Sequence, residues 1–362
     1  MSKRKAGAGR MGLIILCCVL AVVLAALLVF IIVANNLLGQ VQHVEDTTLS
    51  SSQIEEFLDE NTVTVTGPTI RDEDVDFGTE PTETQESTQP TETQESTQPT
   101  EEIKTGNLVN ILLIGQNANS ASSWQKSEVM ILCTFNKDTK TVTMTSFLPD
   151  IYVQIPGFGN YKLNMAYTIG GMKLLNQTLE ENFGLKINGN IAVNYSSFMK
   201  LIDKAGGVEI KLTAAEADYL NDHGNWGVTT MGGWNLKEGQ NTLTGEQAMG
   251  YALLKKIGGE AERTTRQRKV IAALLEQAKK KSLTELYDLA MDTAAMFSTN
   301  MTDNQIKAYI TELAPMLMDM QVVTQRIPVD GSYSYKNVGN IGNCAVIDFD
   351  ANRKVLAEML NP

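Results

Sequence analysis

Residues 107–115 read NLVNILLIG, an apolar run that ends in a glycine. Such a short run is typical of a buried β-strand. Three more runs rich in β-forming residues follow it, over residues 129–135, 141–147 and 151–155. Turn residues at 136–138 separate the first two of these three runs, so a group of neighbouring strands is predicted here.

Beyond these strands, helical and strand patterns alternate to the end of the chain. This alternation predicts an α/β domain over residues 103–362, a three-layer α/β/α sandwich with a mixed central sheet. The predicted helices cover residues 171–183, 197–205, 244–254, 263–280, 283–297 and 303–318, with a last one from Asp350. The predicted strands of this part cover residues 191–195, 208–212, 321–327 and 345–349.

The negative charge of the chain is concentrated outside this domain. The formal net charge is −12, and residues 71–102 alone hold eleven acids and one base. Residues 82–90 read TETQESTQP, and residues 91–99 repeat those nine letters. Such a segment has too little apolar surface to order itself. Residues 35–102 are therefore predicted to be an acidic low-complexity linker, a disordered stalk; a glycosylated or partner-binding segment is the alternative.

A membrane anchor is predicted before the linker. Residues 11–34 contain no charge, and as a helix they would span roughly 36 Å, enough for a bilayer core of ~30 Å. Four bases lie in residues 1–10, and no base follows until Arg71. The positive-inside rule then predicts a single-pass protein of the cell membrane with a cytoplasmic basic tail and an extracytoplasmic C-terminal domain. A cleaved signal peptide is the alternative.

Several chemistries are excluded by composition. The chain has two histidines, His43 and His223, so a zinc site built from histidines is not expected. The phosphate loop of nucleotide hydrolases and the dinucleotide-binding glycine pattern are both absent. The four cysteines show neither metal-ligand spacing nor a disulfide framework.

One predicted helix carries arginines on its apolar side. At about 100° per residue, Arg263, Arg266 and Gln267 extend the core-facing stripe, whereas Arg268 and Lys269 point away from it. Buried guanidinium groups are costly unless they meet anions. Two explanations stay open: a phosphate-binding pocket at the start of this helix, or pairing with structural carboxylates such as Asp150 or Glu246.

Seven sequence pieces occur in an order that resembles the LytR-CpsA-Psr family of cell-envelope proteins. The resemblance covers about residues 107–275 and extends more loosely to the C-terminus. The pieces are NILLIGQN (110–117), KSEVMIL (126–132), TMTSF leading to DIYVQIPG (143–157), KLNMAY (162–167), a glycine pair (170–171), LTGEQAMGYA (243–252) and ERTTRQRKV (262–270).

This resemblance implies a phosphotransferase that moves a glycan polymer from polyprenyl pyrophosphate to peptidoglycan. It also implies that acidic residues hold Mg²⁺, that arginines neutralise the pyrophosphate, and that the lipid tail lies in an apolar pocket between sheet and helices. Both metal and guanidinium charge suit the charge that develops during attack at phosphorus. The implied partners are the lipid-linked glycan, peptidoglycan and the membrane. Nucleic acid is not expected, because the domain is neutral and the predicted span separates it from DNA.

The resemblance carries functional roles onto individual residues of this chain. It implies a metal site at Glu128 and, weakened by the loss of a charge, at Asn117. Catalytic roles are implied for Glu128, Asp150, Lys255 and Gln267, and pyrophosphate binding for Lys162, Lys255, Arg263 and Arg266.

The chain departs from the family pattern at three of its charged positions. Asn117 replaces an aspartate, and Pro149 and Leu253 each replace an arginine. Glu128 and Lys255 keep the charge of the residues that they replace. Because the loss of one transition-state donor can cost ~10²–10³ in rate, reduced activity is predicted. The alternative is a pseudo-enzyme, a non-catalytic binder or scaffold for lipid-linked wall glycans.

Overall fold

The computed structural model describes residues 39–44, 53, 107–116, 127–222, 234–317 and 321–360 of the chain. The predicted cytoplasmic tail, membrane span and most of the predicted linker lie outside these residues. Within the described residues, none of the helices has both the length and the apolar character needed to cross a bilayer.

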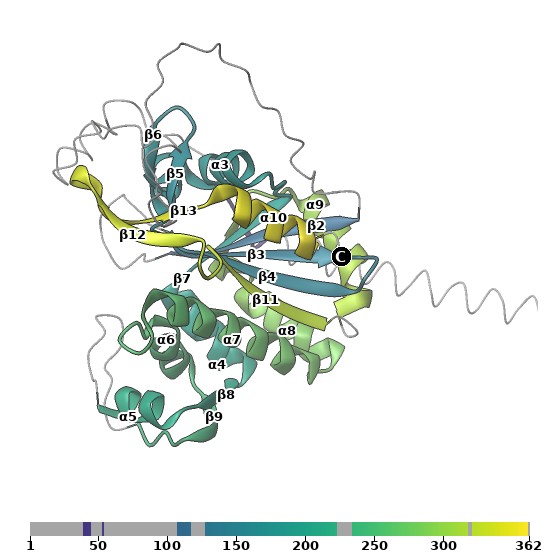
Figure 1. The fold of residues 1–362 in the computed structure, drawn as a ribbon. Helices are drawn as coiled ribbons and strands as arrows, with labels where there is room; N and C mark the ends of the chain where they lie inside the picture. Colours follow the sequence, from purple (N-terminus) through teal and green to yellow (C-terminus); the bar gives the residue numbers. More distant parts are fainter. Residues whose placement is uncertain are drawn as a thin grey trace, which may run out of the picture.

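The centre of the fold is a seven-stranded mixed sheet, as predicted (Figure 1). β2 is antiparallel to β3 but parallel to β7, and β11 is parallel to β4. In spatial order the strands are β1 (Gln42–His43), β10 (Phe297–Thr299), β7 (Gly189–Asn194), β2 (Leu108–Gln116), β3 (Ser127–Asn136), β4 (Thr141–Phe147) and β11 (Gln321–Ile327).

Helices α3 (Leu163–Phe183) and α10 (Phe349–Leu360) cover one face of the sheet (Figure 1). The side chains that point to this face include Leu112, Ile114 and Leu132, all nearly inaccessible to water. α3 is broken at Gly170–Gly171, where Gly171 has φ +61°. The glycine pair therefore allows a backbone turn that other residues would resist. The helix begins at Leu163, eight residues earlier than predicted.

Helices also cover the opposite face, so the predicted three layers are present. Ile131 and Met144 of the sheet pack there against Ile271 of one helix, while Ile111 packs near Leu313 of another. The helices of this layer are α4 (Tyr195–Ala205), α6 (Gly245–Leu253), α7 (Gly259–Lys279) and α9 (Asp303–Leu317), and α8 (Leu283–Thr293) packs beside α4.

Three hairpins and a short helix extend from this sandwich. The predicted strand 208–212 belongs to one of them and not to the central sheet. The hairpins are β5 (Tyr152–Ile155) with β6 (Gly159–Lys162), β8 (Val208–Leu212) with β9 (Gly239–Leu243), and β12 (Tyr333–Val338) with β13 (Gly342–Ile347). The helix is α5 (Ala214–Asp222), and the 3₁₀ turns are Ala294–Met296 and Gly339–Ile341.

The edge strand β1 comes from within the predicted linker. Gln42 and His43 pair in parallel with β10, and the Val44 amide donates to the Thr299 carbonyl at 2.9 Å. The His43 ring lies 2.9 Å from the Asp303 carboxylate. The described chain thus pairs with the central sheet at residue 42 and again from residue 108.

Candidate functional site

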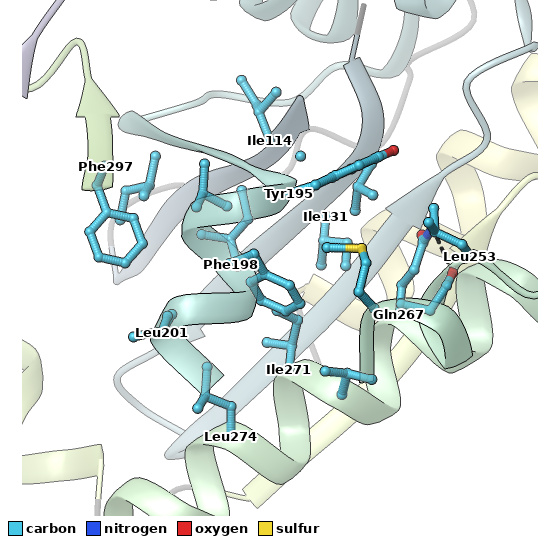
Figure 2. Close-up of a pocket in the computed structure, with 18 residues that line it drawn as sticks. Ile114, Ile131, Tyr195, Phe198, Leu201, Leu253, Gln267, Ile271, Leu274 and Phe297 are labelled. Carbon is cyan, nitrogen blue, oxygen red and sulfur yellow. Dashed lines mark hydrogen bonds between the residues drawn. The ribbon is translucent and has the colours of Figure 1, made fainter. Parts of the chain in front are cut away.

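An apolar cavity of about 250 Å³ lies between the sheet and helices α4, α6 and α7 (Figure 2). Strands β2, β3 and β7 form its floor, and Phe198, Ile271 and Leu274 line it from the helices. Cavities lined by such side chains hold no water and accept apolar ligands. This cavity occupies the place, between sheet and helices, where the sequence predicted a lipid pocket.

Gln267 and Leu253 lie together at one end of this cavity (Figure 2). Gln267 is 5% exposed, and its Nε2 donates to the Ala252 carbonyl at 3.5 Å. Gln267 therefore faces the interior, as predicted. At Leu253 the family pattern has an arginine; here the side chain extends the apolar wall.

A charged cluster formed by Arg263, Glu260 and Lys255 adjoins the same end. Arg263 Nε donates to Glu260 Oε1 at 2.8 Å, and Lys255 Nζ lies 2.7 Å from Glu260 Oε2. Burial would lower the pKa of Arg263, but the Glu260 carboxylate outweighs it and raises that pKa. Burial likewise would raise the pKa of Glu260, yet Arg263 and Lys255 hold it below its usual value. Arg263 and Glu260 are therefore both charged at neutral pH.

Glu128 and Tyr195 connect the charged cluster to the cavity. Arg263 Nη2 donates to the Glu128 carbonyl at 3.4 Å, and the Tyr195 ring forms part of the cavity wall. Burial first, and then the charge of Glu128, raises the pKa of Tyr195 far above its usual value. Tyr195 thus remains protonated where apolar and charged surfaces meet.

Asp150 and Lys255 line a separate polar pocket of about 370 Å³. The pocket also contains Glu260 and Tyr335, and the Tyr335 hydroxyl is hydrogen-bonded to the Asp150 carboxylate. Among the described residues, Asp150 Oδ1 is buried without a hydrogen-bond partner. Burial, and secondly the charge of Glu260, raises the pKa of Asp150, against the opposing effects of Tyr335 and Lys255. A carboxylate with a raised pKa is a suitable general base.

Lys162 lies beside this pocket without lining it. It ends β6, and Cys344 lies close to both Lys162 and Asp150. Burial raises the pKa of the Cys344 thiol to about 11, so this cysteine stays protonated. Lys162 and Asp150, both predicted site residues, thus lie near one another.

Arg266 occupies a different environment from Arg263. Its Nε donates to Glu216 Oε1 at 2.8 Å, its Nη1 donates to the Leu254 carbonyl at 2.8 Å, and both partners of the ion pair are buried. Pairing with a structural carboxylate was one of the two explanations that the sequence left open for the buried arginines. For Arg266 the carboxylate is that of Glu216. The suggested partners, Asp150 and Glu246, were wrong.

The expected direction of Arg268 was also wrong. Arg268 is 6% exposed, whereas the neighbouring Lys269 is exposed as predicted. The prediction assumed that this helix buries only one side. In the structure, α7 packs against β8 on one side and against β3, β4 and β11 on another. A second buried side of the helix is therefore present.

The three positions that depart from the family pattern have different surroundings. Asn117 lies outside the described residues. Pro149 is buried between β4 and β5, and its carbonyl accepts from the Asn164 amide at 3.0 Å. Leu253 is half-buried at the cavity end.

Sequence reasoning missed Glu260, Glu216 and Tyr335. Glu260 could have been found, because it lies three residues before Arg263 in the first helical turn, a spacing that favours ion pairs. Glu216 lies in a helix that was not predicted, and Tyr335 in a strand that was not predicted. Their contacts arise from tertiary packing.

The metal-binding capacity of the described residues is limited. They contain no group of three or more His, Cys, Asp or Glu side chains arranged to hold an ion. Mg²⁺ is, however, commonly bound by one or two carboxylates together with substrate phosphates and water. Glu128 fits such a site only as one ligand beside a phosphate group.

An apolar cavity beside a cluster of charges, in which Arg263 and Glu260 are buried and Lys255 is exposed, suits an amphiphilic, anionic ligand. The LytR_cpsA_psr family model matches residues 77–353, and the chain belongs to this family.

The chain is similar to two proteins of known name. It is 33% identical over 220 residues to the polyisoprenyl-teichoic acid–peptidoglycan teichoic acid transferase TagU of Oceanobacillus iheyensis. This match covers 58% of this chain and 64% of TagU, so the chain spans a little less than two thirds of that relative. It is 28% identical over 264 residues to the regulatory protein MsrR of Staphylococcus aureus, covering 72% and 76% of the two chains.

The fold is shared with a solved structure, TagT with bound octaprenyl pyrophosphate lipid. The TM-score is 0.54 at 20% identity, and the match covers 72% of this chain and 93% of TagT. At this identity the likeness establishes the fold.

Proposed function

We propose that this protein binds a glycan linked to polyprenyl pyrophosphate and serves its transfer to peptidoglycan. The observation that carries the proposal is the apolar cavity, whose wall residue Tyr195 interacts electrostatically with Arg263 and Glu260 of the charged cluster. The polyprenyl tail enters the cavity, and the pyrophosphate lies against the charged cluster. The name of TagU and the lipid bound to TagT support this assignment.

Transfer would proceed by attack of an acceptor hydroxyl on the phosphorus that carries the glycan. Asp150 accepts the hydroxyl proton, the new P–O bond forms, and the pyrophosphate bond breaks to release polyprenyl phosphate. Lys255, Arg263 and Lys162 neutralise the phosphates, and Gln267 orients them at the cavity end. Glu128, weakly assisted by Asn117, would hold Mg²⁺, which when bound neutralises further negative charge.

Arg266 has a positioning role in this proposal. It anchors the Leu254 carbonyl beside Lys255 and pairs with Glu216, so it acts on the pyrophosphate site through the backbone. This assignment replaces direct pyrophosphate contact by Arg266.

We also propose that turnover is slower than in relatives that keep the family's charges, because Asn117, Pro149 and Leu253 lack them. The test is Mg²⁺-dependent transfer from a polyprenyl-pyrophosphate-linked glycan, with the full chain and Bacillus subtilis TagT measured side by side. Lipid binding with turnover at least tenfold below that of TagT is expected. Equal turnover would refute the reduced activity, and absence of binding would refute the function. Binding with no turnover at all would favour the alternative, a scaffold for lipid-linked glycans.

The proposed location is the cell membrane, with the domain outside and its sheet edge near the bilayer. Seven residues, 35–41, separate the predicted span from β1, a reach of about 25 Å. Protease added to intact, wall-stripped cells is expected to remove the C-terminal domain. Its protection from protease would contradict the topology.

A further inference from the structure

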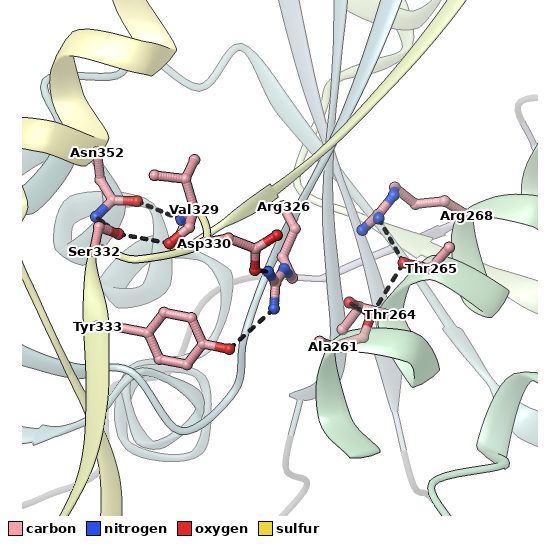
Figure 3. A network of polar contacts seen from close by, with 10 residues as sticks. All are labelled: Ala261, Thr264, Thr265, Arg268, Arg326, Val329, Asp330, Ser332, Tyr333 and Asn352. Carbon is pink, nitrogen blue, oxygen red and sulfur yellow. Dashed lines mark hydrogen bonds and ion pairs between the residues drawn. The ribbon is translucent and has the colours of Figure 1, made fainter. Parts of the chain in front are cut away.

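A second pair of arginines lies between α7 and the edge strand β11, apart from the charged cluster described above (Figure 3). Arg268 projects from the same side of α7 as Ile271 and Ala272, which pack on the sheet. Arg326 is on β11, in register with Ser146 of β4. Both guanidinium groups thus lie at one edge of the sheet, close enough to interact electrostatically.

Arg268 is buried without enough partners. It is 6% exposed, and its Nη2 donates to Thr265 Oγ1 at 3.1 Å (Figure 3). Among the described residues its Nε and Nη1 have no hydrogen-bond partner, and neither has the buried Ser146 Oγ. Burial first, and then the charge of Arg326, lowers the pKa of Arg268 to about 10, while Glu262 opposes this. Unpaired buried donors of this kind cost free energy unless an acceptor reaches them.

The partners of Arg326 indicate the kind of acceptor that the two arginines can bind. Its Nη1 donates to the Tyr333 hydroxyl at 3.2 Å, and its Nη2 is paired with the Asp330 carboxylate (Figure 3). The Arg326 side chain is 11% exposed, whereas the Asp330 side chain is 93% exposed. An exposed carboxylate on the loop after β11 can be displaced by another anion at little cost.

We propose that Arg268 and Arg326 together bind a phosphate-class oxyanion that displaces the Asp330 carboxylate. Two guanidinium forks and the Ser146 hydroxyl offer several donors to the oxygens of one tetrahedral anion, a geometry that arginine suits better than lysine. Among the described residues β11 is the last strand of the sheet, so the proposed anion lies at the edge of the sheet. Tyr333 also lines the polar pocket, so the site lies next to it.

The test is the thermal unfolding midpoint of the full chain in detergent, titrated with inorganic phosphate against chloride at constant ionic strength. A saturable, phosphate-specific rise is expected for the wild type. Arg268→Met should weaken the apparent affinity by about tenfold or more. Its midpoint without phosphate should be no lower than that of the wild type, because unpaired buried donors are removed. Lys269→Met, an exposed neighbour on α7, should keep the wild-type response.

Two further variants keep the proposal falsifiable if Arg268→Met does not fold. Asp330→Asn should tighten phosphate binding several-fold, and Lys255→Met should preserve the response that depends on Arg268. Glycerophosphoglycerol in place of phosphate distinguishes a polymer phosphodiester from free phosphate. A wild type without a phosphate-specific rise, a rise that survives Arg268→Met, or weaker binding in Asp330→Asn would overturn the proposal. No lipid is used, so failure of lipid binding and failure of this site are separate results.

Discussion

Replacing Arg266 with methionine is expected to lower the free energy of unfolding by about 3–5 kcal/mol, because the change leaves Glu216 buried without its counter-charge. The two side chains are 3% and 8% exposed, so water cannot replace the lost partner. The measurement is urea denaturation followed by circular dichroism. Lys204→Met removes an ion pair of similar N–O distance but on the surface, and should change stability by no more than about 1 kcal/mol.

The pH dependence of the free energy of unfolding is a second measurement on Arg266→Met. Burial would raise the pKa of Glu216, but the Thr213 amide and the Arg266 guanidinium hold it below the unfolded value near 4.5. The wild type therefore gains stability above about pH 4.5 and loses it as the pH falls through the lower folded value. Without Arg266, burial dominates and stability should fall as the pH rises instead. A pH profile unchanged by Arg266→Met would contradict the ion pair.

Restoring the family's charges is expected to raise Mg²⁺-dependent transfer by about 10²-fold or more, when Asn117→Asp and Leu253→Arg are combined. Leu253 lies beside Gln267 at the cavity end, so an arginine there can reach the proposed pyrophosphate. Each single change should do little, because both charges act on the same phosphates.

Pro149→Arg is the third change and carries a cost that the first two do not. Pro149 is buried, and proline fixes φ near −65°, so an arginine there must be accommodated by backbone movement. The assay compares the wild type, each single variant, the double variant and the triple variant, with circular dichroism as a check of folding. A folded double variant that stays as slow as the wild type would mean that the loss of rate lies elsewhere, for instance at Glu128.

Much of the fold could be predicted from local sequence patterns. The elements that were not predicted depend on contacts between distant parts of the chain. β4 and β11 occupy the predicted residues because their runs of β-forming side chains are bounded by turn residues. β12, β9 and α5 carry polar, half-exposed sequences whose pairing depends on neighbours distant in the chain. The predicted helix 283–297 ends at Thr293, because Phe297–Thr299 form β10, which pairs with β7 on one side and with β1 on the other.

The candidate site was predictable where a helix face determines it. The inward direction of Arg263, Arg266 and Gln267 follows from helical spacing, and their burial agrees with it. The choice of carboxylate partner was not predictable, because Glu216 approaches Arg266 from a helix 50 residues away. Arg268 was misjudged for the same reason: a projection of one helix does not show that a second surface covers its other side.

Lipid binding inside the domain is tested most directly by photo-cross-linking: a polyprenyl pyrophosphate with a photoreactive tail is bound to the full chain, and the cross-linked residues are identified. Cross-links are expected on the cavity residues Phe198, Leu201 and Ile271, identified by mass spectrometry of the digested protein. Ala252→Trp, which fills the cavity from α6, should abolish them, while the exposed change Lys269→Trp should not. Cross-links confined to residues 11–34, or unaffected by Ala252→Trp, would contradict the proposal that this protein holds its lipid inside the domain.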